Sequence, residues 1–78
     1  MRVSVVFYEL TQKWEGTVEA PQVLTCEEAA ALLLRREDRN PAEELNGVIY
    51  MVDQARRFPD QSLAEGDTLF VYTLLGGG

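Results

Sequence analysis

TCEEAAALLLRR, residues 25–36, is the stretch that decides the fold. It opens with a capping box, in which the side chains of Thr25 and Glu28 each accept a hydrogen bond from the other residue's backbone N–H. The alanines, leucines and arginines that follow are strong helix formers. Acids in the first turn and arginines in the last suit the helix dipole. The sequence therefore predicts a helix over about 26–37, with Leu24 packing as a hydrophobic staple before it.

Two strands are predicted ahead of this helix. Residues 3–8 are rich in β-branched and aromatic side chains, as strands are. A polar turn over 11–13 leads to a return strand over 14–20, in which Trp14 is expected to be a packing residue. Together these segments are interpreted as a β-hairpin.

Shorter elements are predicted after the helix. Asn40 and Pro41 are typical of the cap and first position of a short helical turn, which Gly47 ends. The apolar run 48–52 has the length of a buried strand. Residues 53–65 are polar and are expected to be irregular.

Within the irregular segment, Phe58 and Leu63 are expected to anchor the chain to the core. The Gly66-Asp67 pair predicts a tight turn. A final strand is predicted over 68–75.

The order strand, strand, helix, strand, irregular segment, strand predicts a single-domain α+β fold. A mixed sheet of about four to five strands would pack on one main helix, with the first and last strands central. This is the β-grasp, or ubiquitin-like, arrangement. We expect residues 1–75 to form the domain and 76–78 a flexible glycine tail. Seventy-eight residues suffice for one modest core.

Composition excludes several functions. There is no His and only one Cys, so a Ser–His or Cys–His nucleophile pair and a zinc site cannot form within this chain. Thirteen acidic against seven basic residues argue against nucleic acid as a partner. No apolar run approaches the ~20 residues of a membrane span. We expect a soluble, cytoplasmic protein without a metal, a bound cofactor or catalytic residues of its own.

Gly76-Gly77-Gly78 carries the functional signal. A segment without Cβ atoms can enter a channel too narrow for side chains. Three extended residues reach about 10 Å. The pattern predicts that Gly76 and Gly77 thread a partner's channel and deliver the Gly78 carboxylate to an active site. The alternative is a frayed tail without a role.

The segment 48–78 resembles the sulfur-carrier family, which comprises the small subunit of molybdopterin synthase (MoaD) and the thiamine sulfur carrier (ThiS). An apolar strand is followed by Val52-Asp53-Gln54, then by Leu63-Ala64-Glu65-Gly66-Asp67, a strand and the glycines. Members of the first group usually carry Pro-Pro before the final glycines, where this chain has Thr73-Leu74. The third glycine, Gly76, is closer to the second group.

The resemblance implies a carrier that is not an enzyme. A partner related to the ubiquitin-activating enzymes would use ATP to adenylate the Gly78 carboxylate. Sulfur from a donor such as a cysteine desulfurase or rhodanese would convert it into a thiocarboxylate. A synthase would accept this sulfur in the biosynthesis of molybdopterin, its tungsten counterpart or thiamine.

The final strand is expected to supply the partner interface. Leu69 and Val71 are predicted to point inward, together with the first strand's Val3, Val5 and Phe7. The opposite face would then expose an apolar patch, which usually marks an interaction site. The interface expected there consists of Phe70, Tyr72, Leu74, Leu75, Val6 and Tyr8. The alternatives are reversed faces, or a patch covered by residues 53–65.

Two other functions remain open at this point. The first is a ubiquitin-like modifier, joined through Gly78 to lysines of other proteins. Lys13 is the only lysine, so chains of modifiers could grow only there or at the N-terminus. The second is a non-covalent ubiquitin-like binding module, for which the glycines would be superfluous.

Cys26 and the arginines have simpler interpretations. The helix dipole would lower the pKa of the Cys26 thiol, so a sulfur relay is conceivable, but a small packing residue is preferred. Arg35, Arg36 and Arg39 are expected to form a solvated helix end rather than an anion site.

Overall fold

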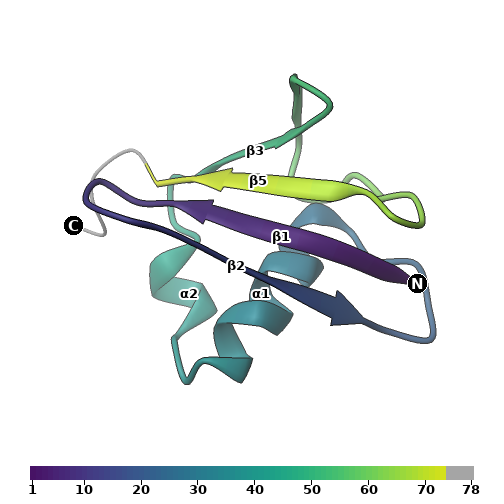
Figure 1. The fold of residues 1–78 in the computed structure, drawn as a ribbon, viewed down its shortest axis with the longest axis horizontal. Coiled ribbons are helices and arrows are strands. Elements are labelled where there is room, and N and C mark those ends of the chain that lie inside the picture. Colours follow the sequence, from purple (N-terminus) through teal and green to yellow (C-terminus); the bar gives the residue numbers. More distant parts are fainter. Residues whose placement is uncertain (74–78) are drawn as a thin grey trace.

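The computed structural model describes residues 1–73, and these form a single-domain α+β β-grasp fold (Figure 1). A five-stranded mixed sheet has the strand order β2-β1-β5-β3-β4, and α1 packs across one face. The elements are β1 (Arg2–Tyr8), β2 (Lys13–Glu19), α1 (Cys26–Arg36), α2 (Pro41–Glu44), β3 (Ile49–Val52), β4 (Ala55–Arg57) and β5 (Thr68–Tyr72).

The first and last strands are central, as predicted. β1 and β5 are parallel, with a register that runs from Ser4 opposite Thr68 to Tyr8 opposite Tyr72. β2 and β3 flank this pair in antiparallel orientation, and β4 closes the edge beyond β3. Because parallel neighbours cannot be joined by a tight turn, the intervening chain crosses over through α1, the element that covers the inner face.

The predicted capping box is present. The Thr25 hydroxyl accepts from the Glu28 N–H at 3.2 Å, and Glu28 Oε1 accepts from the Thr25 N–H at 2.9 Å. Two further N–H groups of the first turn, those of Cys26 and Glu27, donate to the carbonyl groups of Gln61 and Pro59. The segment 59–61 therefore covers the N-terminus of α1. No helix within residues 1–73 has the length and apolar character needed to cross a membrane.

The core lies between the sheet and α1. The side chains of β1 and β5 that point into it are those predicted to do so. The inward side chains of β1 and β5 are fully buried and pack against the leucines and alanines of the helix. Leu63 is a core anchor, as expected, but the same prediction for Phe58 is wrong because 66% of Phe58 is exposed. A turn causes this exposure: the Phe58 N–H donates to Gln61 Oε1 and its carbonyl accepts from the Gln61 N–H, and the ring stays in solvent.

The irregular segment predicted over 53–65 contains the short strand β4. Asp53 and Gln54 both have positive φ, at 52° and 65°, and form a two-residue turn between β3 and β4. Such turns usually contain glycine, so Asp53-Gln54 gave no hairpin signal. Lys13 begins β2 rather than ending the preceding turn, and β5 ends at Tyr72.

Gly16 allows α1 to approach β2 closely. A Cβ atom at this position would lie 2.7 Å from Leu33 Cδ1 and 2.5 Å from Arg36 Nη2. The Arg36 guanidinium can rotate away because it is the end of a flexible side chain. Leu33 is packed among buried core residues, which restrict any shift of its side chain.

We therefore expect Gly16→Ala to destabilise the protein by about 1–3 kcal/mol, the usual cost of an overpacked core. Urea denaturation monitored by circular dichroism measures the change. In a Leu33→Val background, which lacks the clashing δ carbon, the same substitution should cost clearly less. Equal costs in both backgrounds would contradict this packing explanation.

Candidate functional site

Three aromatic side chains line the open face of the sheet, the face that α1 does not cover. Tyr8 stacks on Tyr72 with ring centroids 5.0 Å apart and on Phe70 at 6.0 Å. Lys13 continues the row, with Nζ 5.6 Å from the centroid of the Tyr8 ring. We call Tyr8, Phe70 and Tyr72 the aromatic ladder. All three are partly exposed; Tyr8 and Tyr72 are the last residues of β1 and β5, and Phe70 lies in the middle of β5.

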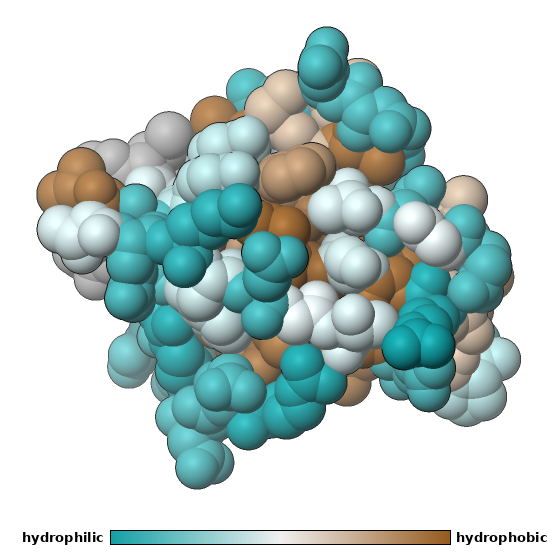
Figure 2. Space-filling model, in the orientation of Figure 1, coloured by the Kyte–Doolittle hydropathy of each residue, from teal (hydrophilic) through white to brown (hydrophobic). Residues whose placement is uncertain are grey.

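Four of the six residues of the predicted interface, Val6, Tyr8, Phe70 and Tyr72, lie on the open face. Val6 lies on it, but its neighbours leave only 4% of the residue exposed, so it adds little accessible surface. Met51 and Ile49, opposite Phe70 and Tyr72 in the register, extend the apolar area and were not predicted. Only the pairing of β3 with β5 reveals their contribution. Figure 2 shows apolar and near-neutral side chains over β1 and β5, with hydrophilic ones around them.

Residues 53–65 do not cover this face. β4 pairs at the far edge of the sheet, and the segment 59–61 bonds to the first turn of α1 on the opposite side. Both alternatives considered for the patch, reversed faces and a covering loop, are therefore wrong for the described residues.

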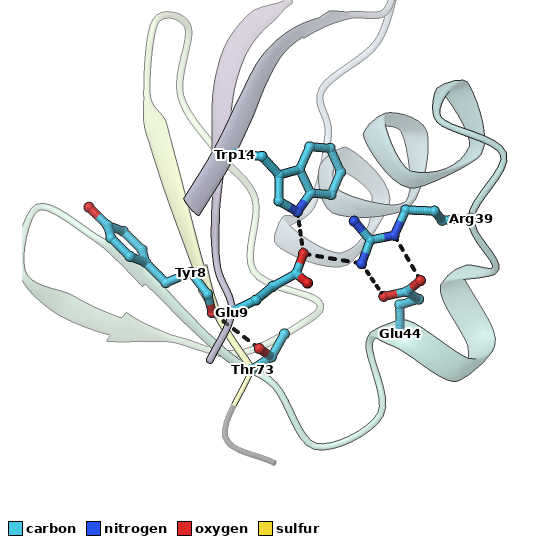
Figure 3. Close-up of polar contacts among 6 residues, drawn as sticks. All are labelled: Tyr8, Glu9, Trp14, Arg39, Glu44 and Thr73. Carbon is cyan, nitrogen blue, oxygen red and sulfur yellow. Dashed lines mark hydrogen bonds and ion pairs between the residues drawn. The ribbon is translucent and has the colours of Figure 1, made fainter. Parts of the chain in front are cut away.

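Thr73 fixes the point at which the chain leaves the sheet (Figure 3). Its N–H and its hydroxyl both donate to the Tyr8 carbonyl oxygen, each at 3.1 Å. Thr73 is thus held at the end of the aromatic ladder formed by Tyr8 and Tyr72. Leu74 and Leu75 of the predicted interface, together with Gly76, Gly77 and Gly78, lie outside the described residues.

A polar cluster supports this exit point from the side of the helices. Arg39 donates twice to the Glu44 carboxylate, at 2.7 and 2.8 Å, and once to Glu9 Oε2 at 3.1 Å. Its guanidinium lies 4.8 Å from the centroid of the Trp14 ring, and Trp14 Nε1 donates to the same Glu9 oxygen (Figure 3). The expectation that Arg39 belongs to a solvated helix end is therefore wrong. We call Glu9, Trp14, Arg39 and Glu44 the Arg39 cluster.

The cluster joins four parts of the chain at the exit point: the β1–β2 turn, β2, the segment after α1, and α2. Glu9 directly follows Tyr8, whose carbonyl holds Thr73. Trp14 also stacks on Phe7 with a centroid distance of 4.6 Å, which confirms it as a packing residue. The hydrogen bonds between Arg39 and Glu44 hold the pKa of the Glu44 carboxyl below its usual value. The same bonds raise the pKa of the Arg39 guanidinium. Arg39 and Glu44 are therefore both charged at neutral pH, and the hydrogen bond from Arg39 to Glu9 stabilises the β1–β2 turn.

Cys26 is a packing residue rather than a reactive thiol. It is fully buried under the segment 59–61, and burial raises the pKa of its thiol despite the opposing charge of Arg57. The expected lowering of this pKa by the helix dipole is wrong because desolvation outweighs it. Residues 1–73 contain no group of three side chains suited to hold a metal ion.

We compared the chain with protein-family models and with curated proteins. No protein-family model matches the chain, and no curated protein matches it significantly.

The Arg39 cluster predicts a pH dependence of stability. Because the pKa of Glu44 is lowered in the folded state, its contribution is present above the usual glutamate pKa of about 4.5 and is lost as pH falls through the lowered value. Glu44→Gln should destabilise the protein by about 0.5 kcal/mol at pH 7, since water screens a partly exposed pair. The deficit should disappear near pH 3 in thermal unfolding followed from pH 7 to pH 3. Glu43→Gln, an exposed neighbour outside the cluster, is the control; a constant deficit at all pH values would contradict the assignment.

Proposed function

We propose that this protein is a sulfur carrier in which Gly78 bears the transferred sulfur as a thiocarboxylate. The observation that carries the proposal is that the central final strand of a β-grasp sheet leads, through the anchored Thr73, into Gly76-Gly77-Gly78. The fold is the one that the resemblance to the sulfur-carrier family implies. A tail that begins at a fixed point beside the aromatic ladder suits delivery into a partner while the ladder docks on it.

The proposed chemistry follows from the poor reactivity of a carboxylate. An activating enzyme transfers AMP from ATP to the Gly78 carboxylate and releases pyrophosphate, which gives the acyl group a good leaving group. A persulfide of the sulfur donor attacks the acyl carbon and displaces AMP. A second thiol then cleaves the sulfur–sulfur bond and releases the thiocarboxylate, a soft nucleophile that a synthase uses as its sulfide source.

This chain supplies positioning rather than catalysis in the proposed scheme. Gly76 and Gly77 thread the partner's channel, since they carry no side chains. Binding of the aromatic ladder offsets the entropy lost when the tail is ordered. The reaction belongs in the cytoplasm, where ATP is available and thiols stay reduced. The recipient is a molybdopterin, tungstopterin or thiamine precursor.

Intact-mass spectrometry tests the proposal directly. After incubation with an activating enzyme of the ubiquitin-activating type, ATP and a sulfur donor, the protein should gain the mass difference between one sulfur and one oxygen atom. Deletion of Gly77 and Gly78 should abolish the gain. AMP transfer without sulfur exchange would favour the protein-modifier function, and retained partner binding without adenylation would favour the binding module.

The role of the aromatic ladder can be tested separately. Phe70→Ser should reduce the rate of adenylation roughly tenfold or more, as loss of an interface aromatic commonly does. The fold should persist because Phe70 lies on the open face. Phe58→Ser is the matched control, since Phe58 is an exposed phenylalanine that does not stack with the aromatic ladder. Equal rates for the two variants, or unfolding of Phe70→Ser in circular dichroism, would contradict the assignment.

A further inference from the structure

One row of side chains crosses the whole open face of the sheet. The strand registers place Glu15 on β2 opposite Val6 on β1, and Val6 opposite Phe70 on β5. Phe70 is in turn opposite Met51 on β3, and Met51 is opposite Arg56 on β4. Residues that are opposite one another in a register share a face of the sheet. The row therefore runs from an acid over three apolar residues to a base, and Phe70 lies at its centre because β5 is the middle strand of five.

The two charged ends of this row have no ion-pair partner within residues 1–73. Glu15 and Arg56 are both exposed, and neither takes part in an ion pair among these residues. The other charged side chains of β1 and β2 on this face do have partners: Arg2 pairs with Glu19 at 3.5 Å, and Lys13 lies over the Tyr8 ring. An acid and a base are thus available to another molecule at opposite edges of one apolar area.

A second copy of the chain is complementary to this row. Two sheets that pack face to face lie about 10 Å apart with their strands nearly aligned. A twofold axis along β5 at Phe70 places β2 of one copy over β4 of the other. Glu15 of each copy then faces Arg56 of the other copy, and Val6 faces Met51. The long side chains of glutamate and arginine can follow the rotation of about 30° that is usual between aligned sheets.

The sheet also has room for side chains of a facing copy. A hollow of about 600 Å³ runs along β5 on the open face, and its lining includes Met51, Phe70 and Tyr72. A side chain that fills this hollow removes apolar surface from water. Because a twofold interface uses the same patch on both copies, the two hollows are filled in the same way.

We propose that the protein forms a twofold dimer through the open face, with Glu15 of each copy paired with Arg56 of the other. The inference goes beyond the proposed function and requires no sulfur chemistry. One consequence does rest on that function: the same face is proposed to dock on the activating enzyme, so the dimer would be a resting form that dissociates before activation.

Sedimentation equilibrium of the full chain tests the dimer. From micromolar to millimolar concentration, the measured mass should rise towards twice that of the chain. The net charge of −6 opposes association at long range, so the experiment is run at physiological ionic strength, where salt screens this repulsion more than it screens a pair in contact. A protein that stays monomeric throughout would overturn the inference and leave the open face to a different partner.

Charge reversal tests the pairing. Glu15→Arg and Arg56→Glu each bring like charges together twice in the dimer, so each variant alone should raise the dimer Kd roughly tenfold or more. An equimolar mixture of the two should dimerise about as well as the wild type, because one variant presents arginine at both ends of the row and the other presents glutamate. This rescue also shows that both variants fold.

Glu37→Arg is the matched control. It changes the net charge as Glu15→Arg does, but Glu37 is exposed at the C-terminal end of α1, the helix that covers the opposite face. Its dimer Kd should therefore stay close to that of the wild type. A weakening equal to that of Glu15→Arg would reduce the effect to net charge and overturn the inference.

Two further results would also overturn it. Unchanged dimerisation of both single variants would place the dimer on another surface, and a mixture that stays monomeric would contradict the twofold pairing. No activating enzyme takes part in these measurements. A failed sulfur exchange would therefore leave an observed dimer intact, and a monomeric protein would leave the proposed carrier function standing.

Discussion

The parallel pairing of β1 with β5 is the constraint on which the rest of this structure depends. It places the first and the last strands side by side at the centre of the sheet. Parallel neighbours need a long connection, and here that connection contains the helix that covers the inner face. The same pairing brings Thr73 to the carbonyl of Tyr8. One pairing therefore defines the core, the covering layer and the exit point of the chain.

A single helical layer leaves the two faces of the sheet chemically different. On the inner face, the side chains of β1 and β5 are fully buried. On the open face, the same strands present tyrosine and phenylalanine, whose rings bury one another partly by stacking. Tyrosine suits such a surface because its ring is apolar while its hydroxyl stays hydrated. The face can therefore remain exposed in water and still offer a partner an apolar contact area.

Local chemistry made most of the fold predictable, and contacts between distant segments account for what was missed. The capping box at Thr25 and Glu28 determines where α1 begins, and the alternation along 68–72 assigns the faces of β5 correctly. β4 was missed because its turn uses Asp53 and Gln54 at positive φ, without the glycine that usually marks such turns.

The candidate site was only partly predictable for the same reason. The aromatic ladder follows from alternation within strands that were recognised. The Arg39 cluster joins residues from the β1–β2 turn, β2, the segment after α1 and α2. No sequence spacing relates these positions, so an ion pair between them can be found only once the fold is known. The hollow beside Phe70 likewise depends on how β3 pairs with β5.

Thr73 is held at the end of the sheet by two hydrogen bonds to one carbonyl oxygen. Thr73 donates both its N–H and its hydroxyl to the Tyr8 carbonyl oxygen, and a proline could make neither bond. The Arg39 cluster then stabilises the adjoining residue, Glu9. The position of Thr73, the last residue that the structure describes, is thus set by hydrogen bonds and charge within the folded domain.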